Sequence, residues 1–184
     1  MNGRIIRGRA YVLGDHIDTD QIISAEHLKL DPSSPDGYAG LGRLAMCGLP
    51  DGFPPFVDPA SGTSPYAIIV AGDNFGCGSS REHAVIALGA AGVRAVVARS
   101  YARIFLRNCV STGELLPVGC AARLNEAVRT GDEIAVWVDE RRVGTPDGRV
   151  DAPIEPVGEL AGIVEAGGLF AYARAAGRMP ARAG

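Results

Sequence analysis

The residues best suited to chemistry lie in a glycine-rich segment, residues 72–84, which reads GDNFGCGSSREHA. Its glycines allow positive φ angles and let a ligand approach the backbone closely. The segment leads into a helical pattern, and the free N–H groups and partial positive charge at a helix start favour an anion. Arg81 adds a guanidinium fork that suits a carboxylate. Residues 76–82 therefore predict an anion site that contains two hydroxyls, those of Ser79 and Ser80.

This segment does not fit three familiar motifs. The dinucleotide-binding pattern G-x-G-x-x-G requires Gly or Ala where Arg81 stands, and the P-loop requires G-K-S/T, which is missing. The nucleophile elbow of hydrolases requires Gly two residues after its serine, and neither Ser79 nor Ser80 has one. His83 lies one helical turn from Ser79, but its direction is not fixed by the sequence. Nucleotide binding and elbow-type hydrolysis are therefore not expected.

A purely structural role for Ser79 stays open from spacing alone. Ser79 and Glu82 fit a capping box, in which the serine side chain bonds the backbone three residues on and the glutamate reaches back. That interpretation explains Ser79 and Glu82. It does not explain why Gly76, Gly78 and Arg81 crowd the same turn.

Composition sets the class of protein. A chain of 184 residues suits one domain, and 47% hydrophobic with 21% charged residues is close to the average for globular proteins. The net charge of −3 argues against nucleic acid as a partner. No apolar run approaches the ~20 residues of a membrane span, and the N-terminus lacks the apolar core of a secretory signal. We therefore expect a cytoplasmic protein.

The cysteines argue against a metal site in this chain. Cys47, Cys77, Cys109 and Cys120 lie far apart without a C-x-x-C pair, which is a poor pattern for zinc or for an iron–sulfur cluster. A disulfide framework is not expected in a chain of this length without an export signal. We therefore expect no metal bound by this chain.

Residues 66–118 predict a parallel sheet. Apolar runs at 66–71, 94–98 and 115–118 are typical of buried strands. Between them we expect helices over 81–88 and 101–111, the second with Ser100 as its N-cap and Gly113 past its end. Strands that alternate with helices in this way are normally parallel, with helical crossovers.

The flanking regions predict other structure. Alternating apolar positions at 133–138 and the turn signal Asp147-Gly148 indicate antiparallel strands over 130–154. A C-terminal helix over 160–178 should break at Gly167-Gly168. Residues 31–64 are rich in Pro, Gly, Ser and Asp, with a short helix over 38–46, and form a loop-rich insert of the kind that often has a function. The fold class is mixed α/β, with a three-layer or barrel-like core.

Residues 72–84 resemble the signature of the swivel domain of the aconitase superfamily. Residues 14–23 (GDHIDTDQII), 98–108 (ARSYARIFLRN) and 166–174 (AGGLFAYAR) resemble further family segments, so the match covers nearly the whole chain. The stand-alone form of this domain is the small subunit of 3-isopropylmalate dehydratase, and the insert is similar to that of the plant type. The resemblance implies a single swivel domain over 1–184, three-layer β/β/α with a mixed barrel-like sheet.

The resemblance also implies an activity. Such subunits take part in the isomerisation of 2-isopropylmalate and 3-isopropylmalate by dehydration and rehydration through isopropylmaleate, in leucine biosynthesis. The partner is a large subunit, in a heterodimer or higher assembly. A 4Fe–4S cluster is expected in that partner, where it acts as a Lewis acid, and no cofactor is expected on this chain.

Site residues carry over from the family by position. Ser79, as an alkoxide, would be the general base, which is reasonable only in a preorganised positive field because serine is otherwise a poor base. The residues expected to bind substrate are Ser79, Ser80, Arg81, Asp20, Thr19 and Lys29. The segment expected to set specificity comprises His27, Leu28, Lys29 and Leu30.

The expected side group of the substrate follows from a departure from the family pattern. Aconitase has an arginine about a dozen residues after the aspartate that matches Asp20, whereas this chain has Leu30, Asp31 and Pro32 in that region. An apolar side group, as in isopropylmalate, is therefore expected. Lys29 keeps a positive charge nearby, so a homoaconitase or methylmalate-type hydro-lyase stays open, as does a non-catalytic anion-binding module.

Overall fold

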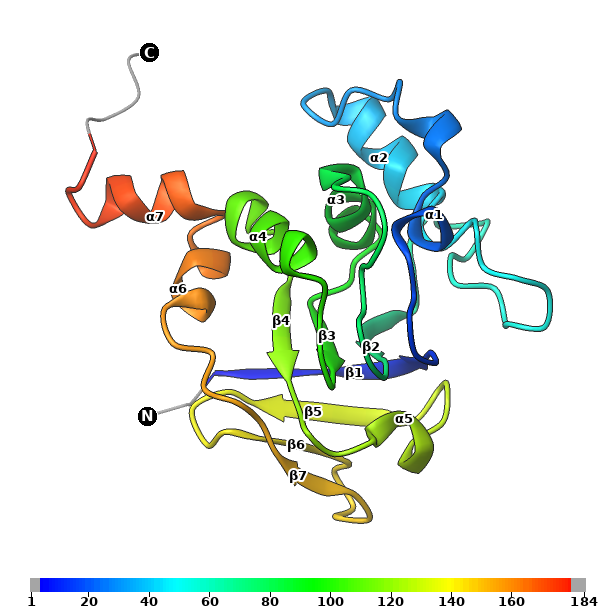
Figure 1. The fold of residues 1–184 in the computed structure, drawn as a ribbon, viewed down its shortest axis with the longest axis vertical. Helices are drawn as coiled ribbons and strands as arrows, with labels where there is room; N and C mark the ends of the chain where they lie inside the picture. Colours follow the sequence, from blue (N-terminus) through cyan, green and yellow to red (C-terminus); the bar gives the residue numbers. More distant parts are fainter. Residues whose placement is uncertain (1–3, 180–184) are drawn as a thin grey trace.

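The computed structural model describes residues 4–179, which form one curled sheet flanked by helices (Figure 1). The strands are β1 (Ile5–Val12), β2 (Tyr66–Val70), β3 (Ala95–Ala98), β4 (Leu116–Gly119), β5 (Glu133–Trp137), β6 (Arg142–Gly144) and β7 (Asp151–Pro153). The helices are α1 (Thr19–Ile22), α2 (Pro35–Arg43), α3 (Glu82–Ala90), α4 (Arg103–Thr112), α5 (Leu124–Ala127), α6 (Leu160–Glu165) and α7 (Leu169–Ala175), with a 3-10 turn, η1, at Ala25–His27.

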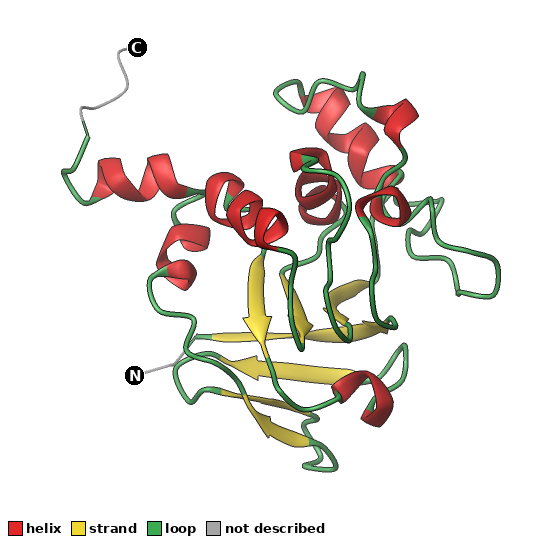
Figure 2. Ribbon diagram, in the orientation of Figure 1, coloured by secondary structure: helices red, strands yellow, loops and turns green. Residues whose placement is uncertain are grey.

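The sheet has a parallel and an antiparallel half that meet at β1. Its strand order is β4-β3-β2-β1-β5-β6-β7, with β1 to β4 parallel and β5 to β7 antiparallel. Residues 5–9 of β1 pair with β5, residues 9–12 pair with β2, and the register shifts between Arg9 and Ala10. Because β1 changes partners along its length, the sheet bends there, and its two halves form separate layers (Figure 2).

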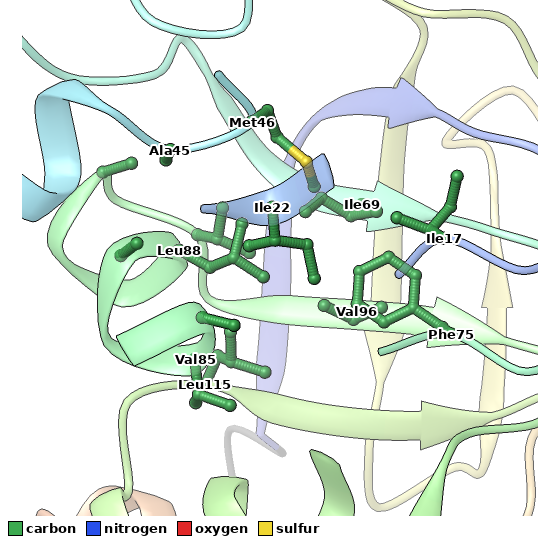
Figure 3. Packing of buried hydrophobic residues seen from close by; sticks show 14 of the residues in the cluster. Ile17, Ile22, Ala45, Met46, Ile69, Phe75, Val85, Leu88, Val96 and Leu115 are labelled. Atoms are coloured by element: carbon green, nitrogen blue, oxygen red, sulfur yellow. The ribbon is translucent and has the colours of Figure 1, made fainter. Parts of the chain in front are cut away.

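Two hydrophobic cores lie on the two faces of the parallel strands. Alternate residues such as Ile69 and Val96 point toward α1 to α4 and contact Ile22, Val85 and Leu88 (Figure 3). The intervening residues point into the bend of the sheet. There they contact the antiparallel strands and α6 in a second core that includes Ile68, Val70, Val97, Ile134, Val136, Val143 and Ala161. The expected three-layer arrangement with a barrel-like sheet is confirmed.

Most expected elements are present, with shifts at their ends. The strands at 66–70, 95–98 and 116–119, the antiparallel region and the helix break at Gly167 are confirmed. Gly113 ends α4 with a φ of 70°, as predicted. The N-cap assigned to Ser100 is wrong: α4 begins at Arg103, and the Ser100 hydroxyl instead accepts a hydrogen bond from the Asn74 N–H at 2.9 Å. β1 was not foreseen from the sequence.

Residues 31–64 fold against the rest of the chain. The short helix expected over 38–46 is α2, which begins earlier, at Pro35, where the Ser34 side chain caps the Gly37 N–H. The aromatic ring of Phe56 is buried and meets Tyr11 edge-on at 4.9 Å between ring centroids. The contact between Phe56 and Tyr11 therefore attaches the insert to β1. None of the helices in residues 4–179 combines the length and apolar character that a membrane crossing requires.

One side chain forms hydrogen bonds to two neighbouring parallel strands, β3 and β4. The hydroxyl of Tyr101 lies 2.7 Å from the carbonyl oxygen of Val96 and 2.9 Å from that of Val118, and it accepts a hydrogen bond from the Val118 N–H at 2.9 Å. Val96 and Val118 are both fully buried. The hydroxyl therefore satisfies backbone groups that water cannot reach.

We expect Tyr101→Phe to lower the free energy of unfolding by about 1–3 kcal/mol, because it removes the hydrogen bonds between a hydroxyl and the buried backbone of β3 and β4. Urea denaturation of the full chain measures the change. Tyr172→Phe in α7 is the control, since no hydrogen bond of the Tyr172 hydroxyl occurs within residues 4–179. Equal loss in both variants, or none in Tyr101→Phe, would contradict this assignment.

Candidate functional site

The candidate site lies where the loops after β1, β2 and β3 meet, at the carboxyl edge of the parallel strands. This edge is where open parallel sheets normally bind ligands. Backbone hydrogen bonds join the loops: the Gly72 N–H donates to Gly14 at 3.1 Å, and the Phe75 N–H donates to Ser100 at 3.0 Å. The glycine-rich loop, residues 72–81, therefore runs between its two neighbours and is held on both sides.

The glycine-rich loop crosses the start of α1. The Gly76 N–H donates to the Ile17 carbonyl at 2.8 Å, and the Thr19 N–H donates to the Cys77 carbonyl at 2.9 Å. The Ser79 N–H donates to the Thr19 hydroxyl at 3.2 Å. Thr19 is only 2% exposed, so its hydroxyl faces the loop backbone. The two sequence motifs that resemble the family thus meet directly in space.

Gly76 is required by its surroundings. Its φ is 75°, which favours glycine, and a Cβ atom there would lie 2.4 Å from the ring of Phe105. That ring comes from α4 and meets the Phe75 ring edge-on at a centroid distance of 5.1 Å. A side chain at Gly76 would therefore push the loop away from α4.

The capping role considered for Ser79 is wrong. α3 begins at Glu82 with Arg81 at the N-cap position, and no side chain caps it. The capping box belongs instead to α1, where the Asp18 carboxylate accepts from the Gln21 N–H at 2.8 Å and the Gln21 side chain accepts from the Asp18 N–H at 2.9 Å. The sequence carries this signal as Asp18-x-x-Gln21.

Ser79 and Ser80 therefore have free hydroxyls. Both residues are exposed, and within residues 4–179 neither hydroxyl has a hydrogen-bond partner. In the same range His83 forms no side-chain hydrogen bond with Ser79, so the pair does not form a hydrolase-type couple. The site offers two hydroxyls on the turn that leads into a helix N-terminus.

Arg81 is mostly buried and held in a fixed direction. Its side chain is 14% exposed, and its Nη1 donates both to the Asp20 carboxylate and, at 3.2 Å, to the Ile23 carbonyl. The hydrogen bond from Arg81 and its positive charge lower the pKa of Asp20 below the ordinary value. Within residues 4–179, the Nε and Nη2 groups of Arg81 have no acceptor. The outer side of the guanidinium fork is thus left for a ligand.

The segment expected to set specificity begins at His27, four residues after Ile23. Leu28 is 38% exposed and Lys29 is exposed, and Lys29 forms no ion pair with residues 4–179. His27 is half-buried, with its Nε2 at 3.3 Å from the Glu26 carboxylate. Leu30 is partly buried and packs against the core between the sheet and helices α1 to α4. Leu28 and Lys29 are therefore the members of this segment that can meet a ligand.

A charged network beside the loop was not foreseen from the sequence. The Asp73 carboxylate lies 2.7 Å from the Arg99 guanidinium and 3.4 Å from that of Arg123, which also reaches Asp15 at 3.5 Å. A hydrogen bond from the Asp73 N–H lowers the pKa of the Asp15 carboxyl. The network links the loops after β1, β2 and β3, and no periodicity in the sequence indicates it.

Residues 4–179 do not fit a metal or an iron–sulfur cluster. In the part of the chain that the structure describes, no group of three or more His, Cys, Asp or Glu residues could hold a metal ion. All four cysteines are free; Cys109 and Cys120 are buried, Cys77 is partly buried and Cys47 is exposed. Burial raises the pKa of the Cys109 and Cys120 thiols, which disfavours the thiolate that a metal needs.

Comparison with known proteins now identifies the family. The sequence profile of the Aconitase C-terminal domain matches residues 49–123. The "3-isopropylmalate dehydratase small subunit 1" of Arabidopsis thaliana is 47% identical over 98% of this chain and 73% of its own length. This chain belongs to the family of 3-isopropylmalate dehydratase small subunits. The family is a branch of the aconitase-type hydro-lyases.

A solved structure and a further sequence relative, both from one organism, carry different names. The crystal structure of a 3-isopropylmalate dehydratase from Methanocaldococcus jannaschii matches with a TM-score of 0.77 and 35% identity, over 95% of this chain and 96% of that one. The "Methanogen homoaconitase small subunit" of the same organism is 39% identical over 91% of both chains. The crystal structure thus shares the fold of this chain, and sequence relatives of this chain carry names that indicate different substrates.

The pairing of Asp20 with Arg81 predicts a pH response. We expect the Asp20 carboxyl to titrate below its ordinary pKa, and Arg81→Gln to return its pKa toward that value, because the ionised guanidinium favours the carboxylate. Since the folded-state pKa is the lower one, the pair stabilises the fold above the unfolded pKa and loses that effect as the pH falls through the folded pKa.

Carbon-13 NMR titration of the full chain measures the Asp20 pKa with and without Arg81. Asp31 is the control, because hydrogen bonds from Ser33 lower its pKa and do not involve Arg81. An Asp20 pKa that Arg81→Gln leaves unchanged would contradict the pairing.

Proposed function

We propose that this chain is the small subunit of a 3-isopropylmalate dehydratase and that, with a large subunit, it interconverts 2-isopropylmalate and 3-isopropylmalate through isopropylmaleate in leucine biosynthesis. The observation that carries the proposal is the exposed, unpaired Ser79 hydroxyl on the turn beside Arg81. The family membership of the chain supports it.

Ser79 is the proposed general base. As an alkoxide, its Oγ takes the proton from one carbon of the malate backbone while the hydroxyl group leaves the neighbouring carbon, which yields the alkene. In the second half of the isomerisation the Ser79 hydroxyl gives its proton to the carbon that lost the hydroxyl group, while hydroxide adds to the carbon that lost the proton, and the alkoxide is restored. Ser79 stands two residues before Arg81, the N-cap of α3, so the positive end of this helix and the charge of Arg81 would favour the ionised form of its hydroxyl.

Arg81 is the proposed carboxylate clamp. Its Nη1 is engaged by Asp20 and Ile23, which leaves the Nε and Nη2 donors to form a paired contact with one substrate carboxylate. The Ser80 hydroxyl is exposed next to it and can donate to the same group. Asp20 supports the site by holding Arg81, and Thr19 supports it through the backbone of Ser79.

The site on this chain is incomplete. Ser79 and Ser80 are exposed rather than enclosed, so a second protein surface is needed to exclude water from the reaction. We propose that the large subunit provides this surface together with a 4Fe–4S cluster, which would supply a Lewis acid for the leaving hydroxyl. The residues of this chain do not fit such a cluster in the part that the structure describes.

The setting proposed for this activity is a single swivel domain over residues 1–184 in the cytoplasm. The single continuous sheet supports one domain for the described part of the chain. The free thiols of all four cysteines suit a reducing compartment.

Ser79→Ala is the direct test of the mechanism. Anaerobic reconstitution of the full chain with a cognate large subunit should give turnover of isopropylmaleate, followed by its alkene absorbance. Removing the base should lower kcat by about 10²- to 10⁴-fold with little loss of substrate binding. Ser61→Ala, in an exposed turn of the insert, is the matched control and should retain the activity.

Two results would contradict the proposal. Normal turnover by the Ser79→Ala complex would remove the serine from the chemistry. Tight binding of phosphate or a malate-type diacid by the isolated chain in calorimetry, without turnover in any complex, would favour a non-catalytic anion-binding module.

A homoaconitase or methylmalate-type hydro-lyase is the second candidate, because the methanogen relative is named for homoaconitase and Lys29 is free to meet a further carboxylate. The exposed Leu28 and the lack of an arginine at residues 30–32 favour an apolar side group. We expect the reconstituted pair to show its highest kcat/KM with isopropylmaleate when it is compared with homoaconitate and a methyl-substituted maleate.

Lys29→Ala gives the matched comparison on the same panel. If Lys29 binds a third carboxylate, its removal should cost homoaconitate about ten-fold or more in kcat/KM beyond its effect on isopropylmaleate. A higher kcat/KM for homoaconitate with the unaltered chain would replace the isopropylmalate assignment.

A further inference from the structure

One face of α4 supports the glycine-rich loop from behind. Phe105 and Asn108 lie three residues apart and so share a face of this helix. Phe105 is buried and its ring fills the space where Gly76 has no side chain. Asn108 contacts the same loop further along, at Ser80, where its side-chain Nδ2 donates to the backbone carbonyl at 3.4 Å. An apolar and a polar contact from one helix thus meet the loop at two places.

Asn108 is an unusual residue for its position. It is 8% exposed and is one of three buried polar residues in the described chain, beside Thr19 and Thr145. Burial of an amide costs free energy unless the amide is hydrogen-bonded. Its amide nitrogen must face the Ser80 carbonyl, because the reversed orientation would place two oxygens against each other. Apart from the backbone of its own helix, the Ser80 carbonyl is the hydrogen-bond partner that compensates for the burial of the Asn108 amide.

The contact fixes the direction of a peptide group. A trans peptide is planar, so its carbonyl and N–H point to opposite sides. If Asn108 holds the Ser80 carbonyl toward α4, the Arg81 N–H points away from α4. Within residues 4–179 this N–H has no acceptor, and it lies at the N-cap of α3, a helix of nine residues. The orientation of this peptide also sets the path of the chain on which Ser79, Ser80 and Arg81 stand.

We propose that Asn108 is a positioning residue for the reaction: by holding the Ser80 carbonyl it orients the Ser80–Arg81 peptide and keeps the Ser79 hydroxyl and the Arg81 guanidinium in their working arrangement. This inference rests on the proposed function. It adds a residue from a different part of the chain, one that does not touch the substrate.

Asn108→Asp tests the role with almost no change in shape. An ionised carboxylate cannot donate a hydrogen bond and repels the Ser80 carbonyl. We expect kcat of the reconstituted complex to fall about 10- to 100-fold, because a small misplacement of catalytic groups raises the barrier to the reaction, and KM to rise, because the displaced Arg81 binds the substrate carboxylate less well. The ratio of variant to unaltered kcat should rise as the pH is lowered, because the introduced carboxyl regains a donor when it is protonated.

Asn108→Leu, which has a similar volume and no donor, should show the same loss of kcat without that recovery at low pH. Ser111→Ala is the matched control, since Ser111 is exposed on the same helix. Amide NMR spectra of the full chain alone give a second measurement: the Ser80 and Arg81 resonances should shift in both Asn108 variants and stay in place in Ser111→Ala.

The outcomes are separable. Unaltered kcat in both Asn108 variants overturns the proposal, as does a loss of kcat with unchanged Ser80 and Arg81 resonances and no pH-dependent recovery. If the unaltered complex shows no turnover, the proposed function fails instead. The amide resonances then still decide whether Asn108 orients the peptide.

Discussion

The site depends on the crossing of two loops, one after β1 and one after β2. At this crossing Gly76 donates to Ile17, Thr19 donates to Cys77, and the Thr19 hydroxyl accepts from Ser79. The glycine-rich loop can lie so close to its neighbours only because Gly76 has a positive φ and no side chain to strike Phe105. These contacts hold Ser79 and Ser80 at the molecular surface, just before α3 begins at Glu82. Without the crossing, the hydroxyls of Ser79 and Ser80 and the guanidinium of Arg81 would not be held in a fixed arrangement relative to one another.

The electrostatics of the site follow from this geometry. Arg81 is mostly buried, and a buried guanidinium is stable only when it is paired. Asp20 supplies the pairing from α1 and leaves the other donors of Arg81 uncovered. The helix N-terminus and the guanidinium then place positive charge on the same turn as the exposed Ser79, which favours an ionised hydroxyl over a neutral one. Solvent screens this potential while the site is open, which agrees with a chain that works against a partner surface.

Much of the architecture could be predicted because its causes are local. Continuous apolar runs produced β2, β3 and β4, alternation produced β5, and Gly167 and Gly113 ended helices where expected. The elements that the sequence did not predict correctly all depend on tertiary contacts. β1 pairs along half its length with each of two strands, so its residues follow no single pattern of burial. Ser79 and Ser100 have the right type for helix caps, but tertiary contacts placed the helix starts at Glu82 and Arg103 instead.

The sequence by itself determined the chemical groups of the site: a glycine-rich turn, two adjacent hydroxyls, an arginine and an acidic residue in a second motif. Their types and order along the chain are enough to predict an anion site and to show the resemblance to the family. Only the tertiary structure decided how they act together. Asp20 and Arg81 are far apart in sequence and meet because parallel strands bring their loops to one edge of the sheet. The role of Asn108 also follows from tertiary structure, because its contact joins a helix to a loop through packing, and no local sequence pattern indicates such a contact.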